Sequence, residues 1–185
     1  MKKIILSVLG HDRPGILAAV SELLLVNGCN IENASQTILQ SVFGSLLLVS
    51  LPVDLSPDLL KSRMSESLAG MELDIFIKEF SSSLVQEPGV HPSEAFIITA
   101  FGPDQPGLVS AVSRCVANHG INISNLRAVF KGGNEPGDNV MIFEVDIPDS
   151  ADLKQVNDDL DKVAVRLNLT INLQHRGIFN AMNRI

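Results

Sequence analysis

The stretch Gly10-His11-Asp12-Arg13-Pro14-Gly15 decides the fold of this chain, because it occurs twice. The second copy, Gly102-Pro103-Asp104-Gln105-Pro106-Gly107, lies 92 residues further on. At the same offset, residues 28–33 (GCNIEN) are echoed by residues 120–125 (GINISN), and 12 of the 30 positions in 4–33 and 96–125 are identical. The chain is therefore an internal duplication, and one structural unit is built twice.

The length and composition agree with two small globular units. The chain has 185 residues, of which 45% are hydrophobic, so each repeat would have roughly 80–90 residues and a core of its own. Trp and Tyr are both missing, so the core must be aliphatic with some Phe. Two units of this size are expected to stabilise each other by packing.

The charge argues against nucleic acid as a direct partner. The formal net charge is −7, and an acidic surface repels phosphate backbones. The missing Trp and Tyr also remove the usual platforms for base stacking.

The cysteines and the N-terminus indicate a cytoplasmic protein. Cys29 and Cys115 occupy different positions of the repeat and form no CxxC motif, which is typical of reduced thiols. The apolar run after Met1 is too short and too charged at its end for a signal peptide, and it recurs at 96–101. No apolar stretch approaches the ~20 residues of a membrane span, so no membrane partner is expected.

The first repeat reads as β-α-β-β-α-β. Strands are predicted at 3–9, 29–40, 45–53 and 72–80, with a turn near 41–44. A first helix follows Pro14 and ends at Asn27-Gly28, and a second begins at Ser56-Pro57-Asp58 and closes at Gly70.

The second repeat follows the same plan. Strands are predicted at 95–101, 121–130, 140–147 and 168–174, and helices at 106–118 and 150–166. The connection 131–139 is longer and richer in Gly than its counterpart.

The predicted fold class is α+β, with two ferredoxin-like βαββαβ units. Each has an antiparallel four-stranded sheet with both helices on one face. The predicted domains are 1–80 and 94–174, joined by a linker at 81–93 and followed by a C-terminal helical extension at 175–185.

The repeated loop has the chemistry of a small-ligand site. A loop that leaves a strand and enters a helix presents free N–H groups and the positive end of the helix dipole, which suits a carboxylate. Gly10 and Gly15 allow close approach of a ligand, and Asp12 can accept from an ammonium group. Asn30 can both donate and accept, and Asp104 and Asn122 would act likewise in the second repeat.

A structural interpretation of the same residues stays open. An Asp before a helix is often a cap, an Asn after Gly often settles a turn, and the glycines can serve turn geometry alone. The two copies also differ. Only the first has His11 and the cation Arg13, an additional partner for a carboxylate unless it is simply solvated.

The sequence does not favour an enzyme. The histidines are scattered, and the glycine-rich loops match neither a dinucleotide-binding nor a phosphate-binding loop, so no catalytic residue and no cofactor is expected. The acidic group Asp158-Asp159-Asp161 is predicted to be a solvated helix face and not a metal site.

The two motifs and their spacing resemble the ACT domain. Both repeats carry Gly-x-Asp-x-Pro-Gly-[Ile/Leu] followed by Gly-x-Asn-Ile, and a stand-alone tandem pair resembles the glycine cleavage system transcriptional repressors. The resemblance implies a regulatory module that binds amino acids at interfaces between units, with the Asn reaching in from a neighbouring unit. The ligand-binding residues expected on this basis are Gly10, His11, Asp12, Arg13, Pro14, Gly15, Ile16, Asn30, Ile31, Gly102, Asp104, Gln105, Pro106, Gly107, Leu108, Asn122 and Ile123.

The predicted function is therefore non-catalytic regulation. A bound amino acid would favour one arrangement of units, and that arrangement would act on a partner protein, in a homodimer and within the control of glycine metabolism. The alternative is a structural interaction module without a small ligand, which would pair through the open edges of its sheets.

Overall fold

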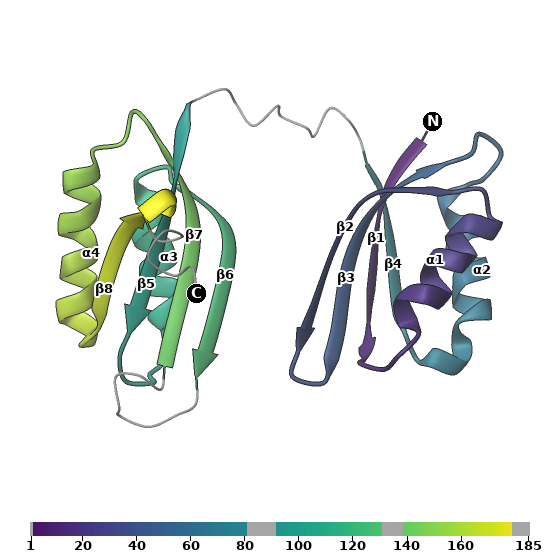
Figure 1. The fold of residues 1–185 in the computed structure, drawn as a ribbon, viewed down its shortest axis with the longest axis horizontal. Coiled ribbons are helices and arrows are strands. Elements are labelled where there is room, and N and C mark those ends of the chain that lie inside the picture. Colours follow the sequence, from purple (N-terminus) through teal and green to yellow (C-terminus); the bar gives the residue numbers. More distant parts are fainter. Residues whose placement is uncertain (1, 81–91, 131–138, 179–185) are drawn as a thin grey trace. The chain divides into compact units, whose positions relative to one another are not determined.

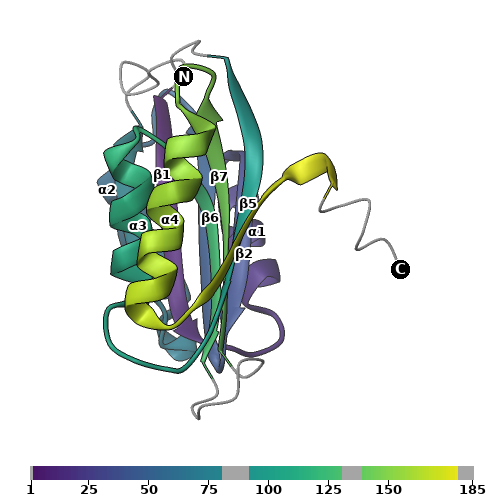
Figure 2. The same cartoon turned by 90° about the vertical axis from the view of Figure 1, so that its left-hand side faces the viewer.

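The protein folds into two βαββαβ units (Figure 1). The computed structural model describes residues 2–80, 92–130 and 139–178. Unit 1 comprises Met1–Glu87 and unit 2 comprises Pro88–Ile185. Each has a four-stranded antiparallel sheet with two helices on one face, which Figure 2 shows for α3 and α4 of unit 2. The predicted fold class is confirmed.

Unit 1 has the strand order β2-β3-β1-β4, with β1 in the interior of the sheet. Its elements are β1 (Lys2–His11), α1 (Ile16–Val26), β2 (Asn30–Leu39), β3 (Val42–Leu51), α2 (Pro57–Ser67), the 3-10 turn η1 (Ala69–Met71) and β4 (Asp74–Phe80).

Unit 2 repeats this topology with the order β6-β7-β5-β8. Its elements are β5 (Ser93–Phe101), α3 (Leu108–Asn118), β6 (Asn122–Phe130), β7 (Asn139–Pro148), α4 (Leu153–Leu167) and β8 (Thr170–His175).

Each unit has its own aliphatic core between the sheet and the helices. Alternate residues of β1 point inward, and Ile4, Leu6 and Val8 are fully buried. The helix α1 meets them with Ile16, Val20 and Leu24, which share one face because they are four residues apart. In unit 2 the corresponding core surrounds Phe143, which is fully buried.

The turn between β2 and β3 differs from the prediction. It was expected near 41–44. Instead β2 ends at Leu39 and β3 begins at Val42, and Gln40 adopts a left-handed φ of 56°. Gly44 lies within β3 opposite Leu9. A two-residue connection needs a left-handed backbone, and here a residue other than Gly supplies it.

The predicted linker and C-terminal helix lie largely outside the described residues. Of the linker 81–93, the structure describes only 92 and 93, and Ser93 already belongs to β5. Of the extension 175–185, His175 ends β8 and residues 176–178 form a helical turn. The domain boundaries remain predictions.

Candidate functional site

The N-termini of α1 and α3 are the feature that the two motifs build. Gly15 is the N-cap of α1 with φ 93°, and Gly107 is the N-cap of α3 with the same φ. At both ends, no side chain within the described residues bonds to the first N–H groups. Both glycines occupy the left-handed region, which disfavours residues with a Cβ. These helices therefore begin with free donors.

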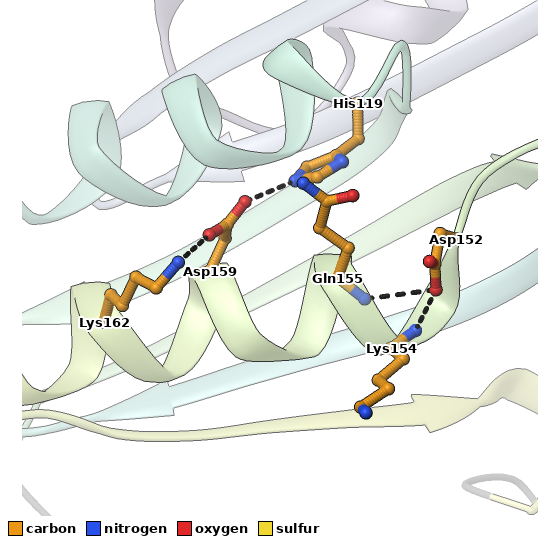
Figure 3. A network of polar contacts seen from close by, with 6 residues as sticks. All are labelled: His119, Asp152, Lys154, Gln155, Asp159 and Lys162. Carbon is orange, nitrogen blue, oxygen red and sulfur yellow. Dashed lines mark hydrogen bonds and ion pairs between the residues drawn. The ribbon is translucent and has the colours of Figure 1, made fainter.

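The other two helices are capped in the ordinary way. The hydroxyl of Ser56 accepts from the N–H of Leu59 at 3.2 Å, at the start of α2. At the start of α4, Asp152 Oδ1 accepts from the N–H groups of Lys154 at 2.9 Å and Gln155 at 3.2 Å (Figure 3). The free N-termini are thus specific to the repeated motif.

The aspartates of the motif do not cap these helices. Asp12 is half-buried and Asp104 is exposed, and the carboxylate of neither accepts a hydrogen bond from any residue that the structure describes. The main-chain N–H of Asp12 donates to Ser41 O at 2.7 Å, which fixes the loop against the β2–β3 turn. Neither carboxylate therefore caps its helix by a hydrogen bond, and neither is occupied by a donor in the described part of the chain.

Arg13 holds its loop to η1, and Gln105 holds its loop to the C-terminal end of α4. Arg13 Nη2 donates to Gly70 O at 3.2 Å, and Gln105 Nε2 donates to Leu167 O at 2.6 Å. Residue types that differ in charge thus perform one structural task. The sequence did not indicate this role for either side chain.

The first glycine of each motif is required by packing. A Cβ on Gly10 would lie 2.5 Å from Leu73 Cδ2, and a Cβ on Gly102 would lie 2.5 Å from Leu169 Cδ2 and 2.9 Å from Asn168 O. Glycine at these two positions therefore leaves space for the segment that leads into β4 in unit 1 and into β8 in unit 2.

The remaining motif residues divide between surface and core. His11, Pro14 and Pro106 are exposed, and Nδ1 of His11 lies 3.1 Å from Asp12 O. The side chains of Ile16 and Leu108 are buried, and Ile31 and Ile123 pack against the two cores.

The second loop lines a hollow of about 420 Å³. Predicted ligand residues on its wall are Asp104, Gln105, Gly107 and Leu108. Val109, Ser110 and Phe130 complete it. A small ligand at this place would contact both the free N-terminus of α3 and an aspartate.

The asparagines lie at the opposite end of the sheet from the loop of their own unit. Asn30 pairs with Ser50, which pairs with Lys3, whereas His11 pairs with Val42 at the far end of β1. Eight residues of strand separate these levels, or about 26 Å. Asn122 pairs with Asp146 in the equivalent register. The loop and the asparagine of one unit therefore cannot contact one small ligand.

A β-bulge follows the asparagine in both units. The register shifts between Ile31 and Asn33 and again between Ile123 and Asn125. Bulges bend an edge strand and redirect its side chains. Beside the first bulge, Lys3 Nζ forms an ion pair with Glu32 at 2.7 Å.

The groove between α3 and α4 is a second hollow, which the sequence did not predict. Its volume is about 670 Å³, and its wall includes Arg114, Arg166 and Cys115. At one end Asp159 accepts from His119 at 3.0 Å and from Lys162 at 2.6 Å (Figure 3). Asp159 was expected to be only solvated, and it instead connects two helices.

The electrostatics of the groove follow from these contacts. The hydrogen bond from Lys162 lowers the pKa of Asp159, with a smaller contribution from His119, and the same bond raises the pKa of Lys162. Burial raises the pKa of Cys115, and the nearby Asp159 adds to this. The Cys115 thiol is thus protonated at neutral pH and a poor nucleophile.

Two further observations concern the described residues only. Residues 2–80, 92–130 and 139–178 contain no helix that is long and apolar enough to cross a bilayer. The same residues contain no group of three or more His, Cys, Asp or Glu placed to hold a metal ion.

Relatives of known sequence match one unit or part of a longer protein. The UPF0237 protein of Methanopyrus kandleri is 33% identical over 79 residues, which cover 42% of this chain and 88% of that protein. A phosphoserine phosphatase of Mycobacterium tuberculosis is 28% identical over 128 residues. This match covers 68% of the chain, but the chain spans only 30% of the phosphatase.

The solved structures that match both units include the following two. A protein of unknown function from Galdieria sulphuraria has a TM-score of 0.73 and 25% identity, over 94% of this chain and 98% of that chain. A protein assigned provisionally as a glycine cleavage system transcriptional repressor has a TM-score of 0.67 and 20% identity, over 94% and 96% of the two chains. At this identity, the second match shows the fold alone.

The family assignment rests on both halves of the molecule. The sequence model of the ACT domain matches residues 2–78 and again residues 94–174. These ranges coincide with the two βαββαβ units and include both copies of the loop motif. The chain belongs to the ACT domain family, as a tandem pair of ACT units.

Proposed function

We propose that this protein is a non-catalytic regulator that binds an amino acid between ACT units and passes the signal to a partner protein. The observation that carries the proposal is the free N-terminus of α1 and of α3, each beside an aspartate without a hydrogen-bonded partner among the described residues. Such a pair of features fits a ligand with one negative and one positive group.

An amino acid satisfies this arrangement in a simple way. Its carboxylate would accept from the first N–H groups of α1, and its ammonium group would donate to Asp12. The second site would use α3 and Asp104. Asn30 or Asn122 would complete each site from a neighbouring unit, because the strand register separates it from its own loop.

The regulatory step would be thermodynamic linkage. A ligand shared by two units binds better to the arrangement that brings loop and asparagine together, so it increases the population of that arrangement. A partner protein that recognises one arrangement would then sense the amino acid. Control of transcription in glycine metabolism, by way of a partner protein and in a homodimer, is the specific form we propose.

Thermal unfolding of the full chain in the presence of each of the twenty amino acids tests the proposal. One or a few of them should raise the midpoint in a concentration-dependent manner, by the equivalent of about 2.7 kcal/mol at one hundred times Kd. Asp12→Ala and Asn30→Ala should each weaken the response at least ten-fold at an unchanged fold. Glu66→Ala removes an exposed charge from α2 and should leave the response intact.

The result that would overturn the proposal is equally defined. If no amino acid shifts the midpoint at millimolar concentration, or if Glu66→Ala weakens the response as much as Asp12→Ala, the loops are not an amino-acid site.

The interaction module remains the second candidate, because the outer face of the unit 1 sheet is apolar. Leu9 is 40%, Leu46 55% and Phe76 57% exposed on three adjacent strands. Two results together would favour this candidate. The protein would self-associate without any amino acid and lose this association in Phe76→Ser, and no amino acid would shift the thermal midpoint.

A further inference from the structure

The groove between α3 and α4 of unit 2 has a cationic lining above an apolar floor. Its floor contains Cys115 and Val163, both 7% exposed. Arg114 of α3 and Arg166 of α4 lie on its walls, and both side chains are exposed. Figure 2 shows the two helices side by side on one face of the sheet.

Among the described residues, no side chain or carbonyl group binds either arginine. Neither forms a hydrogen bond or an ion pair with any residue in the described part of the chain. The acidic residue on the groove wall, Asp159, already accepts from His119 and Lys162 with its two oxygens (Figure 3). In a chain with net charge −7, two guanidinium groups thus lie at one concave surface without a carboxylate bound to either of them among the described residues.

The free N-terminus of α3 adds to the positive character of the groove. Gly107, its N-cap, lies on the groove wall, and so does Ser110, whose hydroxyl donates to Gly107 O at 3.0 Å. The first turn of a helix carries a partial positive charge, so the groove has three positive features of independent origin.

The first repeat shows that the fold does not require these cations. The offset of 92 residues places Glu22 of α1 at the position of Arg114. From β3 and β7 onward the offset between equivalent residues is 96. Val49 pairs with Ile4 and Ile31 in unit 1, and Val145 pairs with the equivalent residues Phe96 and Ile123 in unit 2, so Val145 is the counterpart of Val49. Gly70 therefore corresponds to Arg166. One cation of the groove is replaced by an acid in unit 1, and the other by a residue without a side chain.

We propose that this groove binds a small organic anion with two or more charged oxygens, a carboxylate or phosphoryl group, held between Arg114 and Arg166. The planar guanidinium group matches both oxyanions in a bidentate manner. The volume of about 670 Å³ is within the usual range of roughly 300–1,000 Å³ for small-molecule sites. The groove wall carries no aromatic side chain among the residues that line it, so a compact metabolite fits better than a nucleotide base.

This site is separate from the proposed amino-acid site, although both adjoin the N-terminus of α3. The hollow at the second loop also has Gly107 and Ser110 on its wall. An anion in the groove would therefore lie beside residues that also line the hollow at the second loop. Its binding does not depend on Asp104, so either proposal can fail without the other.

Isothermal titration of the full chain with sodium phosphate and with sodium succinate, at constant ionic strength, tests the inference. At least one probe should bind saturably with one site per chain. Arg166→Gln, and Arg114→Glu, which introduces the residue type of the first repeat, should each weaken binding at least ten-fold. Arg127→Gln removes an exposed arginine of β6 and should retain full affinity.

A second readout uses the two cysteines. Bound anion should slow the alkylation of Cys115, on the groove floor, and leave the rate at Cys29 of unit 1 unchanged. Binding of phosphate alone would identify a phosphorylated ligand, and binding of succinate alone a dicarboxylate. Absence of both up to about 20 mM, a loss in Arg127→Gln equal to that in Arg166→Gln, or equal protection of Cys29 would overturn the inference.

Discussion

At the scale of single residues, the two glycines of each motif are required for different physical reasons. Gly15 and Gly107 are fixed by their backbone, because a φ of 93° disfavours any residue with a Cβ, and their N-cap position leaves the helix N-terminus free. Gly10 and Gly102 have an ordinary φ and are fixed by close packing. The motif therefore combines a requirement of the fold with a feature suited to a ligand.

Gly102→Ala should destabilise unit 2 by about 1–3 kcal/mol, the usual cost of overpacking. Its Cβ would lie 2.9 Å from the carbonyl oxygen of Asn168, and a backbone atom yields less readily than a side chain. Gly70→Ala is the control, since its Cβ would meet nothing within 4 Å. Urea unfolding followed by circular dichroism measures both. Equal stability of the two variants would contradict the packing argument.

At the scale of elements, each unit connects the end of its first helix to its second helix by one polar contact. In unit 1 Arg63 Nη1 donates to Asn27 Oδ1 at 2.6 Å, and in unit 2 His119 Nε2 lies 3.0 Å from Asp159 Oδ2. The positions correspond, at offsets of 92 and 96, but the charge on the second helix is reversed. The contact itself was retained through the duplication while its chemistry changed.

Asp159→Asn should lower the thermal midpoint at pH 7, and the difference from the unchanged protein should vanish in acid. The pKa of Asp159 in the folded protein is lowered, first by the hydrogen bond from Lys162, so folding favours its ionised form. This contribution is complete above the ordinary value of 3.8 and is lost as pH falls through the lowered pKa.

Asp158→Asn is the matched control for this prediction, because Asp158 is an exposed neighbour on α4. Thermal scans from pH 7 down to pH 2 should separate the two variants at neutral pH only. A deficit of Asp159→Asn that persists at pH 2 would show that the lost interaction is not ionic.

Periodicity predicted the order and type of the described strands and α-helices, but not the separate 3-10 turn η1 or the details that depend on the three-dimensional packing. The turn at Gln40 was missed because a left-handed residue other than Gly has no reliable sequence signal. The groove was missed because Arg114 and Arg166 lie on different helices, far apart in sequence. Alignment of the repeats, with Glu22 and Gly70 at these positions, was the one signal available.

At the scale of the whole molecule, the proposed amino-acid site needs residues from two units. Each unit has a complete core and a complete sheet, so duplication was not required for folding. The strand register, however, keeps the loop and the asparagine of one unit about 26 Å apart. The resemblance to the ACT domain implied that the asparagine comes from a neighbour, and for the proposed site the strand register would be the physical reason.

The fragment 1–87 should therefore fold but not respond to the amino acid that stabilises the full chain. It contains Asp12 and Asn30, yet as a monomer it cannot bring them to one ligand. Circular dichroism would establish its fold, sedimentation its monomeric state, and thermal scans its response. The response should be at least ten-fold weaker than that of the full chain. A monomeric fragment that responds fully would place the whole ligand at the free N-terminus of α1 and would remove the asparagine from the site.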